Sequence, residues 1–122
     1  MATPEFEHIK LSMVGDVVLI ELTTKDIQGP ALAQALGTEL AHVSAQEWAK
    51  RILLDFHKVA YFSSTGFAVL FRVVSQGRAK KQEIRFCRME PAVELGAEIV
   101  GLDKVTEIHE TQESALKAFS KA

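Results

Sequence analysis

Three consecutive hydroxyl residues, Ser63, Ser64 and Thr65, lie between two apolar runs in the segment VAYFSSTGFAVLF, residues 59–71, and Gly66 follows them directly. At the start of a helix, such a side chain can accept a hydrogen bond from a backbone N–H group, as a cap worth about 1 kcal/mol. It can instead carry a phosphoryl group, because the unpaired N–H groups and the helix dipole favour negative charge there. A helix needs one capping hydroxyl, so three in a row make this segment a candidate binding or modification site.

Aromatic residues flank the hydroxyl segment. Tyr61 and Phe62 come directly before it, and Phe67 comes shortly after it. We expect Tyr61 and Phe62 to provide exposed or half-exposed apolar surface around a polar centre, which is typical of protein interfaces. Phe67 belongs instead to the apolar stripe of the following helix, and we expect it to be buried.

Other kinds of site have weaker support in the sequence. The histidines lack metal-ligand spacing and only one cysteine is present, so we expect no metal site; they are His8, His42, His57 and His109. A hydrolase with Ser64 as nucleophile and His57 as base is the least favoured hypothesis, because the Gly-x-Ser-x-Gly pattern and an orienting acid are not evident. Glycine-rich phosphate loops are absent as well, so no cofactor is expected.

Composition and charge restrict the possible partners. The 122 residues carry a formal net charge of −2, and nucleic-acid binders usually have a clear basic excess. Cys87 cannot form an internal disulfide, and we expect a buried thiol and a cytoplasmic protein. The start, MATPEFEHIK, does not resemble a signal peptide, and no apolar run is long enough for direct membrane insertion. One basic group is interpreted as a solvated face or a docking patch for an acidic partner: Arg78, Lys80, Lys81, Arg85 and Arg88.

A hairpin is predicted near the start of the chain. His8–Val14 alternates apolar and polar residues, which is typical of a half-buried strand. Gly15 and Asp16 form a two-residue turn to a second strand, Val17–Leu22, which is mostly apolar on both faces. The alternating apolar residues of the first strand are Ile9, Leu11 and Met13.

Two helices and a strand are predicted in the middle of the chain. The polar loop TTKDIQG, residues 23–29, leads to Pro30, which suits the first turn of a helix of about four turns. Arg51–Phe56 follows as a buried strand, and a second helix runs from about Thr65 to Ala79. The apolar stripes of the two helices consist of Leu32, Leu36, Leu40 and Val43, and of Phe67, Leu70, Phe71 and Val74.

The last third continues the alternation of strands and helices. Glu83–Arg88 is predicted as a strand, Pro91 opens a helix to about Val100, and Lys104–His109 forms a short final strand. Thr111 caps a last helix that carries Ala115, Leu116 and Phe119. The order ββαβαβαβα predicts a single α/β domain over residues 1–122, with about four helices on a mostly parallel mixed sheet of about five strands, the first antiparallel to the second.

Two stretches resemble STAS domains, the family of anti-sigma factor antagonists and their relatives. The run LLDFHKVAYFSSTGFAVLFRV is similar to the family signature, in which a strand containing Asp precedes Asp-Ser-Ser-Gly-Leu-Gly and an apolar helix. The later run MEPAVELGAEIVGLDKVTEIHETQESALKAF is similar to the family's Pro-opened helix, Gly-Leu-Asp-Lys, short strand and terminal helix. The resemblance covers nearly the whole chain, and its fold agrees with the one predicted from the residues.

The resemblance implies a phosphorylation switch. In the family, the serine that corresponds to Ser64 accepts phosphate from ATP through a serine-kinase anti-sigma factor. The unphosphorylated protein binds that kinase and frees the sigma factor, and a phosphatase resets the switch. By the same resemblance, Thr65 is the second choice as phosphoacceptor, and the partner-binding residues are Asp26, Ser63, Thr65 and Gly66.

This sequence departs from the family pattern at three positions of the signature. Ser63 replaces the Asp before the acceptor, Thr65 replaces the second serine, and Ala68 replaces the second glycine. The lost acid favours an alternative, a STAS adaptor subunit that is not phosphorylated and belongs to a larger assembly, such as a lipid-transport complex or a signalling scaffold.

Overall fold

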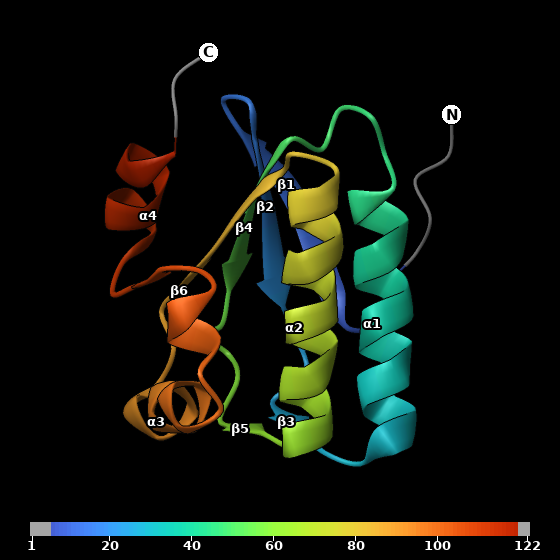
Figure 1. Cartoon of the computed structure of the whole chain (residues 1–122). Helices are drawn as coiled ribbons and strands as arrows, with labels where there is room; N and C mark the ends of the chain where they lie inside the picture. The colour runs from blue at the N-terminus through green and yellow to red at the C-terminus, as the bar shows by residue number, and fades with distance from the viewer. Residues whose placement is uncertain (1–5, 120–122) are drawn as a thin grey trace.

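A five-stranded mixed sheet forms the centre of the computed structural model, which describes residues 6–119 (Figure 1). The strands are β1 (Ile9–Val14), β2 (Val17–Leu22), β4 (Arg51–Asp55), β6 (Glu83–Cys87) and β7 (Ile108–His109), in the spatial order β1-β2-β4-β6-β7. β1 runs antiparallel to β2, and the other pairs are parallel. The predicted fold class and the antiparallel first strand are confirmed.

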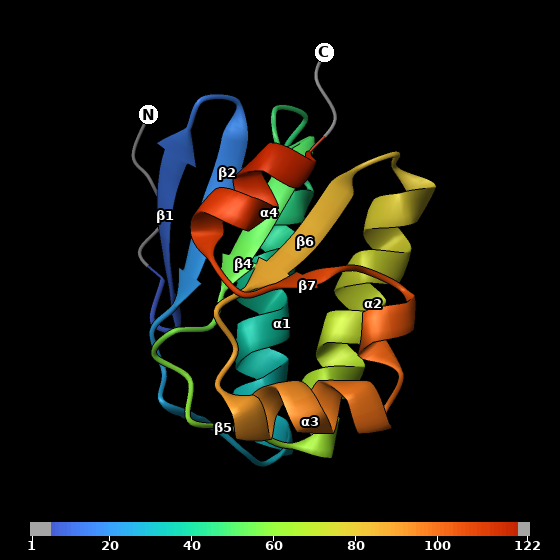
Figure 2. The ribbon, with the colours of Figure 1, turned by 90° about the vertical axis from the view of Figure 1, so that its left-hand side faces the viewer.

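Helices cover both faces of this sheet. They are α1 (Pro30–Ser44), α2 (Ser64–Ala79), α3 (Pro91–Ile99) and α4 (Gln112–Ala118). α1 and α2 pack against each other on one face, and α4 lies on the other face against β4, β6 and β7 (Figures 1 and 2). α3 lies at the end of the molecule where α2 begins, beside the short strand β5 (Figure 2).

The alternation of side chains along the strands produces two apolar cores. In β4, Ile52 and Leu54 face α1 and α2, whereas Leu53 faces α4. The smaller core under α4 includes the buried Cys87, as the sequence predicted, together with Ala115 and Phe119. Parallel strands that are covered on both faces need apolar residues on both sides, which explains the continuous apolar run of β4.

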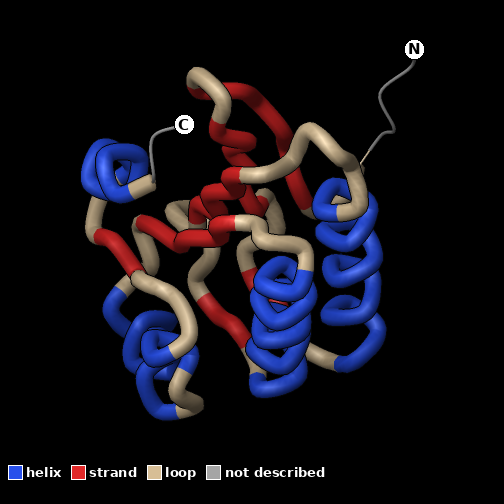
Figure 3. The backbone as a smooth tube through the Cα atoms, turned by 45° about the horizontal axis from the view of Figure 1, so that its top comes forward, coloured by secondary structure: helices blue, strands red, loops and turns tan. Residues whose placement is uncertain are grey.

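Two very short strands were not predicted. β3 (Asp26–Ile27) and β5 (Tyr61–Phe62) pair in parallel, with Asp26 opposite Tyr61, and form a second sheet at the start of α2. Strands of two residues have no detectable periodicity, so the sequence indicated only loops in both places. Figure 3 shows the strand segments and the loops that join them to the helices.

The last predicted strand was too long. Leu102–Lys104 forms a 3₁₀ helix after Gly101, whose backbone has a φ of 83°, and only Ile108–His109 joins the sheet. The other boundaries agree within a residue or two, and Thr111 caps α4 as predicted, because its side chain accepts a hydrogen bond from the Ser114 N–H group at 3.0 Å.

The expectation for the first strand was wrong at one end. Ile9 is buried and Leu11 is half-buried, but Met13 is exposed. β1 is the edge strand, and its hairpin extends beyond the ends of α1 and α2 (Figure 1). The helices therefore cover only the beginning of its inner face.

Candidate functional site

The three hydroxyl residues have different positions at the start of α2. Ser63 is the N-cap, and its Oγ accepts a hydrogen bond from the Gly66 N–H group at 3.2 Å. The Ser63 Oγ and Thr65 Oγ1 atoms are also hydrogen-bonded to each other at 2.9 Å. Ser64 is exposed in the first turn, and its side chain makes no hydrogen bond within residues 6–119. Of the three hydroxyls, that of Ser64 is available to another molecule.

The β3–β5 pair brings Asp26 to this helix end. Asp26 is exposed and lies opposite Tyr61, and the Ser63 N–H group donates to the Ile27 carbonyl oxygen at 2.8 Å. A residue that is far from the hydroxyl segment in the sequence therefore lies on the strand beside it. Asp26, Ser64 and Thr65 are exposed at this end of the molecule, and Ser63 is half-buried.

Gly66 has a packing role. It is buried, and a Cβ atom at this position would lie 2.6 Å from the Phe62 ring and 3.2 Å from Ile27 Cγ2. An aromatic ring cannot move aside as easily as the end of a flexible chain. Gly66 therefore lets Phe62 pack beneath the first turn of α2, and the reachable surface comes from its neighbours.

We expect Gly66→Ala to destabilise the protein by about 1–3 kcal/mol, because the added methyl group overpacks the contact with Phe62. Urea unfolding followed by circular dichroism measures this loss. The matched control is Gly66→Ala in a Phe62→Leu background, where the ring is absent. The penalty should be smaller there, and equal penalties in both backgrounds would contradict the proposed clash.

The flanking aromatic residues are only partly exposed. Tyr61 is 50% exposed, whereas Phe62 and Phe67 are buried, with their ring centroids 5.0 Å apart. The expectation of exposed surface was correct for Tyr61 and wrong for Phe62, and Phe67 is in the core as predicted. Successive residues of a strand point to opposite sides, so one of the two residues of β5 faces inward.

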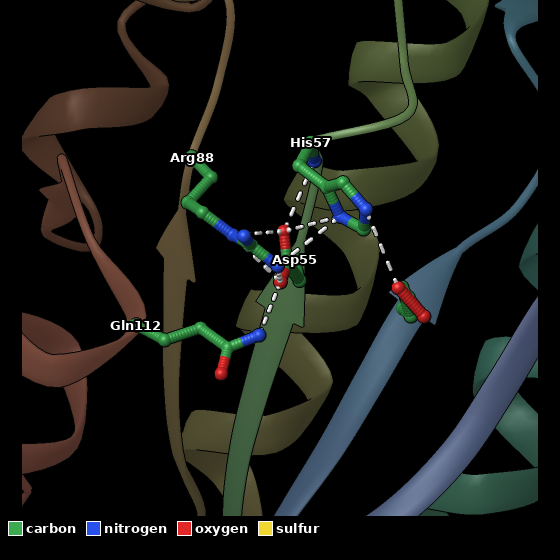
Figure 4. A network of polar contacts seen from close by, with 5 residues as sticks. Asp55, His57, Arg88 and Gln112 are labelled. Atoms are coloured by element: carbon green, nitrogen blue, oxygen red, sulfur yellow. Dashed lines mark hydrogen bonds and ion pairs between the residues drawn. The ribbon is translucent and has the colours of Figure 1, made fainter.

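A second polar cluster, centred on Asp55, lies at the carboxyl end of β4 (Figure 4). The Asp55 side chain is fully buried. The Arg88 guanidinium donates to both of its carboxylate oxygens, from Nε at 3.1 and 3.0 Å and through a further short bond from Nη2. Gln112 Nε2 donates at 2.5 Å, and the His57 N–H group donates at 3.0 Å. β4, β6 and α4 are thus joined through one carboxylate.

These contacts keep the Asp55–Arg88 pair charged. Burial raises the pKa of Asp55, but the hydrogen bonds from Arg88, Gln112 and His57 and the charge of Arg88 outweigh it, so that the pKa lies below its ordinary value. The hydrogen bond to Asp55 raises the pKa of Arg88.

Burial raises the pKa of the Cys87 thiol to about 12, which leaves it protonated and unreactive at neutral pH.

The basic group of the sequence does not form one solvated face. Arg88 pairs with Asp55, and Arg78 Nη2 donates to the Val105 carbonyl oxygen at 2.6 Å. Lys80 reaches the Ser44 carbonyl oxygen at 3.4 Å, and Arg85 lies 2.9 Å from a Glu107 carboxylate oxygen. Four of the five side chains therefore contact separate segments of the protein, whereas the docking-patch interpretation stays a prediction. The sequence did contain one indication of the Asp55 cluster, because an acid at the end of a buried strand requires a partner.

His57 belongs to the Asp55 cluster. Its Nδ1 lies 3.2 Å from Asp55 and its Nε2 lies 3.5 Å from Glu21 (Figure 4). An acid therefore does orient this histidine, contrary to expectation, but within the described residues no hydrogen bond joins it to Ser64. The described residues also contain no group of three or more potential metal ligands, and none of their helices is long and apolar enough to cross a bilayer.

Comparisons with known proteins agree with this geometry. A family model described as STAS domain matches residues 21–115. BtrV of Bordetella bronchiseptica, named as a candidate anti-sigma factor antagonist, is 32% identical over 92 residues, which cover 75% of this chain and 78% of that protein.

Solved structures are similar in fold. A candidate anti-sigma factor antagonist from Thermotoga maritima has a TM-score of 0.79 at 15% identity and covers 89% of this chain and 92% of its own. The Bacillus cell fate determinant SpoIIAA, solved in its phosphorylated form, has a TM-score of 0.66 at 16% identity and covers 89% of this chain and 96% of its own. At such low identity these similarities describe the fold alone.

Proposed function

Because this chain belongs to the STAS domain family, we propose that it is a bacterial anti-sigma factor antagonist whose phosphoacceptor is Ser64. The observation that carries the proposal is the exposed Ser64 hydroxyl, which makes no hydrogen bond within residues 6–119, beside two hydroxyls that are bonded to each other. A kinase can reach this oxygen without breaking a contact of the folded protein. Thr65 is the second choice, because its hydroxyl is exposed but already bonded to Ser63.

The proposed switch acts through charge. The unphosphorylated protein binds a serine-kinase anti-sigma factor in the cytoplasm, where ATP is available, and the sigma factor is released. Phosphorylation adds a charge of about −1.5 to −2 in the middle of that interface, and the cost of desolvating it ends the binding. A phosphatase restores the hydroxyl.

The helix end suits such a modification. The first backbone N–H groups of α2 have no partners within the helix, and the helix dipole favours an anion beside them. The Gly66 N–H group is already used by Ser63. A phosphate on Ser64 can therefore be accommodated without unfolding the first turn, so its effect falls on the partner that docks there.

The relatives support the same assignment at a coarser level. BtrV and the Thermotoga maritima protein are both named as candidate anti-sigma factor antagonists. SpoIIAA was solved in a phosphorylated form, so a protein of this fold can carry the modification. The names of these relatives favour a partner-switching function. The assignment of Ser64 as the phosphoacceptor is our own and rests on its position at the start of α2.

The alternative is an adaptor that binds its partners without being phosphorylated. It is favoured by Ser63, which stands where the family has an acid and which caps α2 as a neutral hydroxyl. The cap is retained, but a negative charge beside the acceptor is lost. A kinase that depends on that charge would not act on this protein.

Phosphorylation in vitro separates these possibilities. The purified protein is incubated with ATP and, in turn, with each purified serine-kinase anti-sigma factor of the source organism, and phosphate is located by mass spectrometry. We expect phosphate on Ser64, its loss in Ser64→Ala, and its retention in the matched control Thr65→Ala. Phosphate on Thr65 alone would identify Thr65 as the phosphoacceptor. Absence of phosphorylation by all of these kinases would favour the adaptor function.

A further inference from the structure

Exposure alone does not distinguish the two hydroxyls that a kinase can reach at the start of α2. Ser64 and Thr65 are both exposed, and they are neighbours in the first turn of the helix. Their hydrogen bonds differ, because Thr65 Oγ1 is bonded to Ser63 Oγ at 2.9 Å, whereas the Ser64 side chain makes no hydrogen bond within residues 6–119. Ser63 is therefore the residue that makes the two candidate acceptors unequal.

The position of Ser63 is fixed by several other contacts. Its N–H group donates to the Ile27 carbonyl oxygen at 2.8 Å, and its carbonyl oxygen accepts from the Phe67 N–H group at 2.9 Å. Its Oγ atom also accepts from the Gly66 N–H group at 3.2 Å. The half-buried Ser63 hydroxyl is thus anchored to β3 and to the first turn of α2, and it offers Thr65 a partner at a defined place.

The hydrogen bond to Ser63 opposes the reaction of Thr65 whichever of the two oxygens donates. Phosphoryl transfer forms a bond between the hydroxyl oxygen and the γ-phosphorus of ATP, ADP leaves with the electrons of the broken bond, and a base of the kinase takes the hydroxyl proton. If Thr65 donates to Ser63, its proton is not available to that base. If Ser63 donates to Thr65, a lone pair of the attacking oxygen is occupied. Either arrangement must be broken before Thr65 reacts.

We propose that Ser63 is a positioning residue that determines which hydroxyl is phosphorylated: by bonding the Thr65 hydroxyl, it directs the phosphoryl group to Ser64. This inference rests on the proposed function and extends it to a residue that is not itself modified. It gives the Ser63 hydroxyl a role beyond capping, because the cap requires only the hydrogen bond from Gly66. Thr65 is then a second acceptor that becomes reactive when the hydroxyl at position 63 is lost.

The test uses Ser63→Gly in a Ser64→Ala background. Glycine is almost as favourable as serine at an N-cap, so α2 should keep its first turn while Thr65 loses its partner. The protein is incubated with ATP and the purified kinase that modifies the parent, and phosphate on Thr65 is quantified by mass spectrometry. We expect the kcat/KM for Thr65 to rise by about threefold or more over Ser64→Ala alone, which is the effect of one ordinary hydrogen bond.

The matched control is Ser63→Thr in the same Ser64→Ala background. Threonine and glycine are similarly favourable at an N-cap, but threonine retains a hydroxyl that can bond Thr65. This variant should therefore phosphorylate Thr65 as poorly as Ser64→Ala alone. A purely structural role for residue 63 would not separate the Gly and Thr variants, and thermal unfolding followed by circular dichroism checks that both keep the fold.

Three results in these assays would overturn the inference. They are equal phosphorylation of Thr65 with Gly and with Thr at position 63, no phosphate on Thr65 of the Ser63→Gly, Ser64→Ala protein, and rapid phosphorylation of Thr65 in Ser64→Ala alone. In each case, phosphate on Ser64 of the parent would leave the proposed function intact. If no kinase modifies the parent, the proposed function fails first, and this inference fails with it.

Discussion

Replacing Ser64 with Asp is expected to weaken binding of the serine-kinase anti-sigma factor at least a hundredfold. Ser64 is exposed at the first turn of α2, and its side chain makes no hydrogen bond within residues 6–119. The substitution should therefore leave the fold intact and act only on the interface. An unpaired carboxylate buried there costs about 3 kcal/mol or more, and each 1.4 kcal/mol is about tenfold in affinity. Isothermal titration calorimetry with the purified kinase measures the change.

Neutral variants separate charge from shape. Ser64→Asn has nearly the volume of the Asp variant without its charge, and it should bind much closer to the parent. Ser64→Ala should bind the kinase even after incubation with ATP, because the acceptor oxygen is gone. If the Asp variant binds as tightly as the parent, or if the Asn variant loses as much affinity, charge at this position does not control docking.

Arg88→Ala is expected to destabilise the fold by about 3–5 kcal/mol, because it leaves a buried carboxylate without its cation. Asp55 is fully buried, whereas the Arg88 side chain is 38% exposed. Asp55→Ala should therefore cost less, about 2 kcal/mol, since water can reach the remaining guanidinium. Chemical denaturation of both variants tests this order. A larger loss for Asp55→Ala would show that the cluster is held together in another way.

The same ion pair makes stability depend on pH. The pKa of Asp55 in the folded protein lies below its ordinary value of 3.8. The stabilisation from its charge is thus fully present above the unfolded-state pKa, and it is lost as the pH falls through the lower folded-state pKa. Between neutral pH and about pH 3, the parent should lose more stability than Asp55→Ala does. Parallel losses would mean that Asp55 is not the titrating group.

The start of α2 could be predicted from the sequence because its determinants are local. Ser63, Ser64 and Thr65 precede an apolar stripe with helical spacing, and a capping hydroxyl acts within three residues of its own position. The hairpin at Gly15 and the helix opened by Pro91 were predictable for the same reason. In each case the residue type restricts the backbone where it stands.

The assignment of the hydroxyls needed the structure. The sequence left open which of them caps α2. In the structure, Ser63 is hydrogen-bonded to both Gly66 and Thr65, and Ser64 is exposed. Phe62 was expected near the surface for a similar reason. Its burial depends on β3, a strand more than thirty residues earlier, which pairs with β5 and turns the ring inward.

Residue types and their spacing alone were sufficient for the α/β architecture, the family resemblance and the candidate acceptor, because helix periodicity, turns and caps depend on neighbours in the chain. The tertiary structure alone decided the Asp55 cluster and the burial of Phe62. Arg88 and Gln112 are 33 and 57 residues from Asp55. Arg88 meets it because the parallel strands β4 and β6 end at one edge of the sheet, and Gln112 meets it because α4 packs against these strands. Contacts between distant segments produce no periodic pattern in a single sequence. The sequence alone does not determine which acid pairs with which base, because that depends on the tertiary structure.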